Sequence, residues 1–251
     1  LNAEVIATVD DDNIPYENWG QDLIVGKEVE VDVYENELLA FDPLSVLDVE
    51  YWHRGYPLEL VSQRKDYNYR GKEKRFIHVQ ADLWDGDPDV DAIYRLTQNK
   101  KINFKKGHLV LNSNVFCPFN SQDTFWSNEF FMYMYLPVSV TFRMTDILRG
   151  YIAQRCLWEH NAHLGFFGPN MIQLRNKHNL LNDFSLEIPC FTQVETIINI
   201  LTEIKLGSSP KNNLKKIYAK LYNLKIVEKI ELTALNSWIK DIENISKNKY
   251  D

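Results

Sequence analysis

The sequence predicts an α/β protein, built as an open mixed sheet flanked by helices and followed by a C-terminal helical appendage. Three observations predict this class. The apolar run Val5–Val9 and the alternating segment Phe76–Leu83 are both typical of strands. Apolar residues recur with helical spacing over Ile147–Trp158, and the pattern is helical throughout from Val194 onward. With 251 residues, the chain is long enough for one large domain and the appendage.

Composition and charge exclude several classes of protein. The contents of 45% apolar and 13% aromatic residues exclude disorder, and the net charge of −7 gives no general attraction to nucleic acid or anionic membranes. The longest apolar run, Phe130–Phe142, is too short to cross a bilayer and is broken by Pro137, so we expect a buried strand there. Three widely spaced cysteines without a Cys-x-x-Cys pair indicate neither a disulfide framework nor a zinc knuckle, which favours a reducing, cytoplasmic location.

The run Val5–Val9 leads directly into Asp10, Asp11 and Asp12. An unbroken apolar run predicts a strand buried on both faces, and Pro15 marks where the chain leaves the sheet. The acids are therefore expected at the carboxyl end of a strand, where open α/β sheets bind ligands. Asp10 and Asp12 offer hard oxygen ligands suited to Mg²⁺ or Mn²⁺, and the alternative is an acidic, solvated turn.

Three further segments carry polar side chains that are candidates for a site. Tyr51–Glu59 is dense in aromatic residues around Arg54, as in loops that line sites or in rigid surface turns. Asp89 either caps the helix that Ala92–Leu96 begins or has an acceptor or metal role. Cys117–Thr124 offers amide and hydroxyl groups that can bond to the hydroxyls of a sugar.

Asp146 stands between the apolar run and the helix Ile147–Trp158. Thr145 or Asp146 is expected to cap this helix, and a carboxylate in that position is also a candidate general base. His160 and His163, three residues apart on one face, are candidates for a third metal ligand, although such pairs are more often structural.

The C-terminal part is predicted to be helical and basic. Residues 211–251 carry 9 lysines against 5 acids, which leaves the rest of the chain acidic. These helices either dock a partner or cover the sheet. We expect a first domain over residues 1–190 and a helical segment over residues 191–251. The predicted helices are Thr192–Leu206, Asn213–Asn223 and Val227–Ile245.

In these segments the chain resembles the STELLO family of glycosyltransferase-like proteins, whose catalytic region looks like a GT-A fold. The matching pieces follow the family's order and cover roughly residues 1 to 185. The pieces are Asp10-Asp11-Asp12-Asn13, Arg54-Gly55-Tyr56-Pro57-Leu58, Pro88-Asp89-Val90-Asp91, Pro118 to Thr124, and Asp146 to Tyr151 followed by Gln154-Arg155.

The resemblance implies a Mn²⁺- or Mg²⁺-dependent transferase that moves a sugar from a nucleoside diphosphate sugar to an unknown glycan, lipid or protein acceptor. Asp12 would bind the metal ion directly, and Asp10 would bind it through water or contact the ribose. Asp146 would act as the base, which predicts inversion at the anomeric carbon. The side chains expected to contact the nucleotide sugar or the acceptor are Asp11, Arg54, Asp89, Asp91, Asn120, Gln122 and Arg149.

The resemblance also implies that a part is missing: either the chain is a fragment that lacks an N-terminal part, or it is a shortened protein that forms its nucleotide pocket elsewhere. GT-A folds usually place βα units ahead of the Asp-x-Asp motif, and only nine residues precede it here. Plant family members are Golgi proteins with an N-terminal membrane anchor, so a location in the Golgi lumen is expected if the chain is part of a larger anchored protein. Two alternatives stay open at this point: a non-catalytic interaction protein, and a metal-dependent hydrolase that uses the same carboxylates.

Overall fold

The fold is organised around β4, Asn68–Asp82, the longest strand in the part of the chain that the structure describes. The computed structural model describes residues 3–21, 23–47, 49–98, 100–101, 103–104 and 107–247. The first half of β4 pairs antiparallel with β3 (Glu28–Glu35). The second half lies between β7 (Thr124–Ser127), which is antiparallel to it, and β8 (His163–Phe167), which is parallel. The strand predicted over Phe76–Leu83 is confirmed, although β4 begins earlier.

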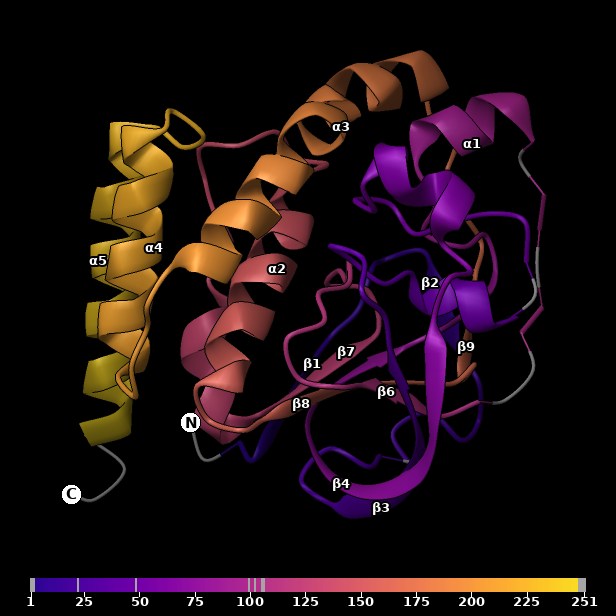
Figure 1. Ribbon diagram of the computed structural model, residues 1–251, viewed down its shortest axis with the longest axis horizontal. Coiled ribbons are helices and arrows are strands. Elements are labelled where there is room, and N and C mark those ends of the chain that lie inside the picture. The colour runs from indigo at the N-terminus through magenta and orange to yellow at the C-terminus, as the bar shows by residue number, and fades with distance from the viewer. Residues whose placement is uncertain are drawn as a thin grey trace.

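The main sheet is mixed, and part of it closes on itself (Figure 1). Its strand order is β1-β7-β4-β3-β6-β8, and β8 also pairs with β4. β1 (Val5–Thr8) lies at one edge, and β6 (Leu109–Leu111) joins β3 to β8. The strands of the closed part share a small cluster of buried apolar side chains. Its members are Val31, Val33, Ile77, Val110 and Phe167.

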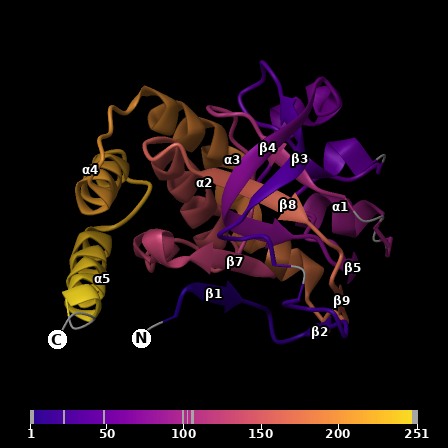
Figure 2. The same ribbon diagram turned by 90° about the horizontal axis from the view of Figure 1, so that it is seen from below.

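Helices cover one face of this sheet. α2 (Thr145–Trp158) lies next to the sheet and α3 (Leu180–Glu203) lies alongside α2 (Figure 1). α4 (Pro210–Asn223) and α5 (Lys229–Lys247) form a pair at the outer side, and the short α1 (Ala92–Thr97) lies far from them (Figure 2). The predicted mixed sheet, flanking helices and C-terminal helices are confirmed, and the architecture is compatible with a GT-A-like fold. In the described residues, no helix combines the length and the apolar character needed to cross a membrane.

A second, small sheet follows the ends of three strands of the main sheet. It consists of β2 (Asn13–Pro15), β9 (Met171–Gln173) and β5 (Asp85–Gly86), in the order β2-β9-β5. These strands follow β1, β8 and β4 in the chain. β1, β4 and β8 run in the same direction, because β7 is antiparallel to both β1 and β4 while β8 is parallel to β4. Polar side chains that follow these three strands therefore meet at one edge.

β1 is an edge strand, which corrects the prediction that Val5–Val9 is buried on both faces. Among the described strands it pairs with β7 alone, and its side chains are half-buried or, at Ala7, exposed. Val9, beyond the end of the strand, is 41% exposed. An apolar run predicts a strand, but the position of that strand in the sheet depends on partners far away in the sequence.

The apolar run Phe130–Phe142 is not a buried strand, which corrects a second prediction. Its first part lies in the 3-10 helix η3 (Asn128–Met134), and the rest is irregular. Pro137 lacks the N–H group that a strand needs in a ladder, so it prevents regular pairing there. Tyr135 still packs in the core, whereas Phe142 is 84% exposed.

The C-terminal helices share one core with the sheet. The predicted helices are confirmed, although α3 begins earlier than expected, at Leu180. Buried side chains of α3, α4 and α5 form a single apolar cluster with those of α2 and the strands. The predicted division after residue 190 falls inside α3. On α5, the fully buried carboxylate of Glu231 accepts hydrogen bonds from the backbone N–H groups of Val138 and Ser139, which fixes the helix to the segment after η3.

Candidate active site at the carboxyl ends of the strands

The acidic turn, Asp10–Asp12, follows β1 and lies at the edge where β1, β4 and β8 end, as predicted. The small sheet holds it in place, because the backbone N–H of Leu174 donates to the carbonyl oxygen of Asp12 at 3.0 Å. Gln173 Nε2 donates to Asp12 Oδ1 at 3.0 Å, and the backbone N–H of Asn176 donates to Oδ2 at 3.2 Å. Asp12 is therefore fixed, whereas Asp11 is exposed in the turn. A contact of Asp11 with substrate stays a prediction.

Arg54 links two of the predicted site aspartates. It lies in a turn between the 3-10 helices η1 (Pro43–Leu47) and η2 (Leu58–Gln63). Its Nε donates to Asp89 Oδ1 at 2.9 Å, and its terminal nitrogens donate to the two oxygens of Asp146 at 3.1 and 3.0 Å. Arg54 is only 5% exposed, and paired bonds of this kind are strong and directional. Burial alone would lower the pKa of Arg54, but the two carboxylates raise it well above its usual value.

Gly55 makes this geometry possible. Its φ of +83° lies in the left-handed region, and a Cβ at this position would collide with the side chain of Ile147 on α2. The backbone can therefore approach α2 closely enough for Arg54 to reach Asp146 in the first turn of the helix. The predicted capping role is corrected, because the N-cap residue of α2 is Met144 and its side chain makes no capping bond.

Asp10 lies beside the ion-paired group Arg54–Asp89–Asp146 and is open to solvent on one side. Partial burial of its carboxyl group raises the pKa to about 6, and the charges of Asp89 and Asp146 act in the same direction, against Arg54. Burial also opposes the ionisation of Asp89, but Arg54 and Arg143, together with the hydrogen bond from Asn120, hold the pKa of Asp89 below its usual range. This edge therefore carries more negative charge than Arg54 neutralises.

Asn120 and Gln122 support the site from within the fold. Asn120 Nδ2 donates to Asp89 Oδ2 at 2.6 Å, and Gln122 Nε2 donates to Asn13 Oδ1 at 2.5 Å. Each of the two amide side chains is 5% exposed. In the structure their amides position Asp89 and the acidic turn, and the contacts with nucleotide sugar or acceptor that the sequence predicts for both residues stay predictions.

Arg149 lies inside the fold, one helical turn after Asp146. It is 2% exposed, and its guanidinium carbon lies 4.8 and 5.3 Å from the ring centres of Trp126 and Phe119. Burial lowers its pKa to about 10. Its Nη2 donates to the carbonyl oxygen of Asn120 at 2.8 Å. Arg149 thus positions the Asn120 segment, and its contact with nucleotide sugar or acceptor stays a prediction.

Asp91, rather than Asp89, caps α1. Its Oδ1 accepts a hydrogen bond from the backbone N–H of Tyr94 at 2.9 Å, and its Oδ2 accepts one from Trp52 Nε1 at 2.5 Å. Burial raises the pKa of Asp91 to about 6, and these two hydrogen bonds act against the rise. Asp91 is 1% exposed, so its carboxyl group stabilises the start of α1, and a contact with nucleotide sugar or acceptor stays a prediction.

The two predicted histidine ligands are not near the acidic turn. They do not share a helix face, because α2 ends at Trp158. His163 begins β8 and therefore lies at the end of the sheet opposite to the acidic turn, and His160 Nε2 lies 3.2 Å from the hydroxyl of Tyr133. Within the described part of the chain, no group of three or more His, Cys, Asp or Glu side chains is arranged to hold a metal ion.

Asp123 was not among the predicted site residues. It is fully buried, its Oδ1 accepts a hydrogen bond from Trp19 Nε1 at 3.1 Å, and its Oδ2 has no hydrogen-bond partner among the described residues. Burial raises the pKa of Asp123 to about 7, against the effect of the bond from Trp19. Its place in a polar segment, Cys117–Thr124, gives no sign that this carboxyl group is enclosed.

We expect Asp123→Asn to change how stability depends on pH. The pKa of Asp123 rises from 3.8 to about 7 on folding, so the folded state binds the proton more tightly and stability falls as the pH rises through this window. The variant lacks the group, so its free energy of unfolding should fall by roughly 3 kcal/mol less than that of the wild type between about pH 4 and pH 7. Urea unfolding of both proteins across this window measures the difference. Parallel profiles would contradict the raised pKa.

A comparison with protein-family models bears on the C-terminal part of the chain, from residue 143 onward. Residues 143–249 match the family model described as STELLO glycosyltransferases. The resemblance to the STELLO family is confirmed. The STELLO match covers α2, α3, α4 and α5 and includes the carboxylate that pairs with Arg54.

Two STELLO proteins of Arabidopsis thaliana are similar to the chain. "Probable glycosyltransferase STELLO1" is 32% identical over 128 residues, which are 47% of this chain and 16% of that relative. "Probable glycosyltransferase STELLO2" is 24% identical over 208 residues, which are 76% of this chain and 26% of that relative. The matched regions thus span a minor part of each STELLO protein.

Proposed function

We propose that this chain is the catalytic region of a glycosyltransferase that moves a sugar from a nucleoside diphosphate sugar to a hydroxyl group of an acceptor. The observation that carries the proposal is the meeting of Asp10, Arg54 and Asp146 at the carboxyl edge of the sheet. Asp146 lies in the region that matches the STELLO glycosyltransferases. An edge with excess negative charge suits a cation and, through the cation, a diphosphate.

Asp10 and Asp12 would hold the Mn²⁺ or Mg²⁺ ion. The fit rests on charge, because Asp10 lies among carboxylates that Arg54 does not fully neutralise, and a cation would relieve their repulsion. Mg²⁺ is commonly bound by one or two carboxylates together with substrate phosphates, so a cage of three protein ligands is not required. When bound, such an ion supplies positive charge that stabilises a departing diphosphate.

Asp146 would take the proton of the attacking hydroxyl group. Arg54 fixes its orientation through both oxygens, and Oδ2 keeps a second lone pair for an acceptor hydroxyl. The side chain of Asp146 is 20% exposed, so an acceptor can reach it. A base that activates the attacking hydroxyl suits a single displacement, which inverts the anomeric carbon.

Turnover tests the proposal. The protein is incubated with Mn²⁺, UDP-, GDP- and CDP-sugars and a panel of saccharide acceptors, and release of the nucleoside diphosphate is measured. We expect Mn²⁺-dependent release from one donor class, lowered about 100-fold or more in Asp12→Asn. Glu17→Gln, which changes an exposed carboxylate in the loop after β2, should keep the wild-type rate. Equal rates in the two variants would contradict the role of the acidic turn.

One observation favours a non-catalytic interaction protein as the second candidate. Both carboxylate oxygens of Asp12 and of Asp146 already accept hydrogen bonds within the chain. Carboxylates that only stabilise a fold are bonded in the same way. A protein of this kind would release no nucleoside diphosphate from any donor.

A further inference from the structure

A cleft opens on the face of β4 that is turned away from α2. Side chains alternate along a strand, and Val79 and Ala81 pack in the core with α2, whereas Gln80 and Asp82 line the cleft. The cleft has a volume of about 610 Å³ and is also lined by the segment after β2, by β3 and by the residues after β8. It therefore lies on the opposite side of the sheet from the ion pair at the start of α2.

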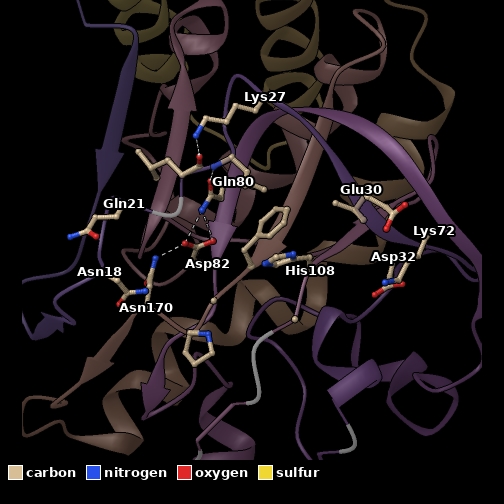
Figure 3. Close-up of a pocket in the computed structure, with 17 residues that line it drawn as sticks. Asn18, Gln21, Lys27, Glu30, Asp32, Lys72, Gln80, Asp82, His108 and Asn170 are labelled. Carbon is tan, nitrogen blue, oxygen red and sulfur yellow. Dashed lines mark hydrogen bonds between the residues drawn. The ribbon is translucent and has the colours of Figure 1, made fainter.

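The floor of the cleft is a fixed group of polar side chains (Figure 3). Gln80 Nε2 donates to both oxygens of Asp82 at 3.0 and 2.9 Å, and Asn170 Nδ2 donates to Asp82 Oδ2 at 2.5 Å. The exposed fractions of Gln80, Asp82 and Asn170 are 2%, 3% and 9%. Gln80 is itself held, because its Oε1 accepts from the backbone N–H groups of Ile24 and Val25. Asn170 Oδ1 has no partner among the described residues, so this floor contains an unused acceptor.

An aromatic surface borders this polar floor. The ring centre of His108 lies 4.8 Å from that of Phe167, and Figure 3 shows His108 beside Asp82. Phe167 is only 4% exposed and lies behind His108, which is exposed. A ligand in the cleft would therefore contact the imidazole ring of His108. Asn18 and Gln21 lie on the other side of Asp82 (Figure 3). A ligand in the cleft would thus meet a ring on one side and amide groups on the other.

The charges of the cleft favour a neutral ligand over a phosphate. The described lining residues include no arginine, and the carboxylate of Asp82 at the floor repels anions. Lys27 Nζ donates to the carbonyl oxygen of Leu23 at 2.6 Å, and Lys72 stands opposite Asp32 in the β3–β4 ladder. The carboxylate and amide groups of the cleft can bond to hydroxyl groups, and the ring of His108 can contact C–H groups. The cleft therefore suits compounds that present several hydroxyl groups on one side and C–H groups on another. Sugars are compounds of this class.

We propose that this cleft binds one neutral sugar unit. Asp82 and Asn170 would accept hydrogen bonds from neighbouring hydroxyl groups of the sugar, and its C–H face would lie on His108. The volume of about 610 Å³ is in the range of small-molecule sites. The site goes beyond the proposed transfer reaction, because it uses neither Asp10 nor Asp146 and requires no metal ion.

Ligand-observed NMR on the whole chain tests this proposal. The ligands are added one at a time in the presence of EDTA: glucose, galactose, mannose and xylose. UDP is added in a separate sample as a nucleotide control. We expect saturation transfer to at least one of these sugars and none to UDP. His108→Ala and Asp82→Asn should each weaken the binding of that sugar by about five- to tenfold, as expected for the loss of one ring contact or hydrogen bond.

The control variant is His178→Ala, because His178 lies outside the cleft and its side chain is 34% exposed. It should bind the sugar as the wild type does. Thermal unfolding shows whether Asp82→Asn is folded, and His108→Ala tests the cleft without changing a buried group. The proposal is overturned if no neutral sugar binds in EDTA, if UDP binds while the free sugars do not, or if His108→Ala binds the sugar as tightly as His178→Ala. Since EDTA removes metal ions, a failure of the proposed transferase reaction would leave the result unchanged.

Discussion

Replacing Arg54 by methionine is expected to lower the free energy of unfolding by about 3–5 kcal/mol. Arg54 is 5% exposed, and its guanidinium group is bonded to both Asp89 and Asp146. Methionine fills much of the same volume without a charge. Asp89, which is 7% exposed, is then left as a buried carboxylate without its cation, and this uncompensated charge is the source of the loss.

Urea unfolding measures this effect, with Arg70→Met as the matched control. Arg70 pairs with Glu35 at 3.0 Å, but its side chain is 47% exposed, so its replacement should cost less than about 1 kcal/mol. Combining Arg54→Met with Asp89→Asn should recover part of the loss, because the buried charge is then removed as well. Equal destabilisation by Arg54→Met and Arg70→Met would contradict a structural role for the ion-paired group.

Asp146→Asn is expected to lower the kcat of sugar transfer by about 10²–10⁴-fold and to leave the protein folded. An amide cannot take the proton of the acceptor hydroxyl, and its oxygen still accepts one of the two hydrogen bonds from Arg54, so one of the two bonds that orient the side chain is kept. The KM for the nucleotide sugar should change little, since Asp146 is assigned to the acceptor. Initial rates at varied concentrations of donor and acceptor separate kcat from KM.

Glu159→Gln is the control for Asp146→Asn. Glu159 follows the other end of α2 and pairs with Arg155 at 2.6 Å, with 25% of its side chain exposed. Its removal changes a carboxylate next to the same helix without touching the acidic turn, so kcat should stay at the wild-type value. If Asp146→Asn keeps kcat within a fewfold of the wild type, its role as the base is wrong.

The position of the acidic turn could be predicted from the sequence, because three acids directly after an apolar run mark the end of a strand. The burial of β1 could not be predicted. Whether a strand is central or at an edge depends on pairing with β7, which is more than a hundred residues away, as Ala7 opposite Phe125 illustrates. Similarly, Phe130–Phe142 is apolar enough for a strand, but its first part lies in η3 and Pro137 prevents regular pairing in the rest.

The partners within the site were also beyond prediction. Arg54 and Asp146 are 92 residues apart in the sequence, and Gln122 and Asn13 are 109 residues apart. A single sequence does not show that residues so far apart form a hydrogen bond. The motifs indicated which residue types gather at the edge, but not which of them face solvent. Asn120 and Gln122 are suitable for sugars by chemistry alone, and only their burial shows that they support the site from behind.

The central claim is that the acidic turn holds a metal ion and a nucleoside diphosphate, and isothermal titration calorimetry tests it most directly. UDP, GDP and CDP are each titrated into the wild type, Asp10→Asn and Glu17→Gln, once with Mn²⁺ and once with EDTA. The prediction is Mn²⁺-dependent binding of one nucleotide, weakened at least about tenfold in Asp10→Asn and unchanged in Glu17→Gln. The absence of Mn²⁺-dependent heat with all three nucleotides in the folded wild type would contradict the claim.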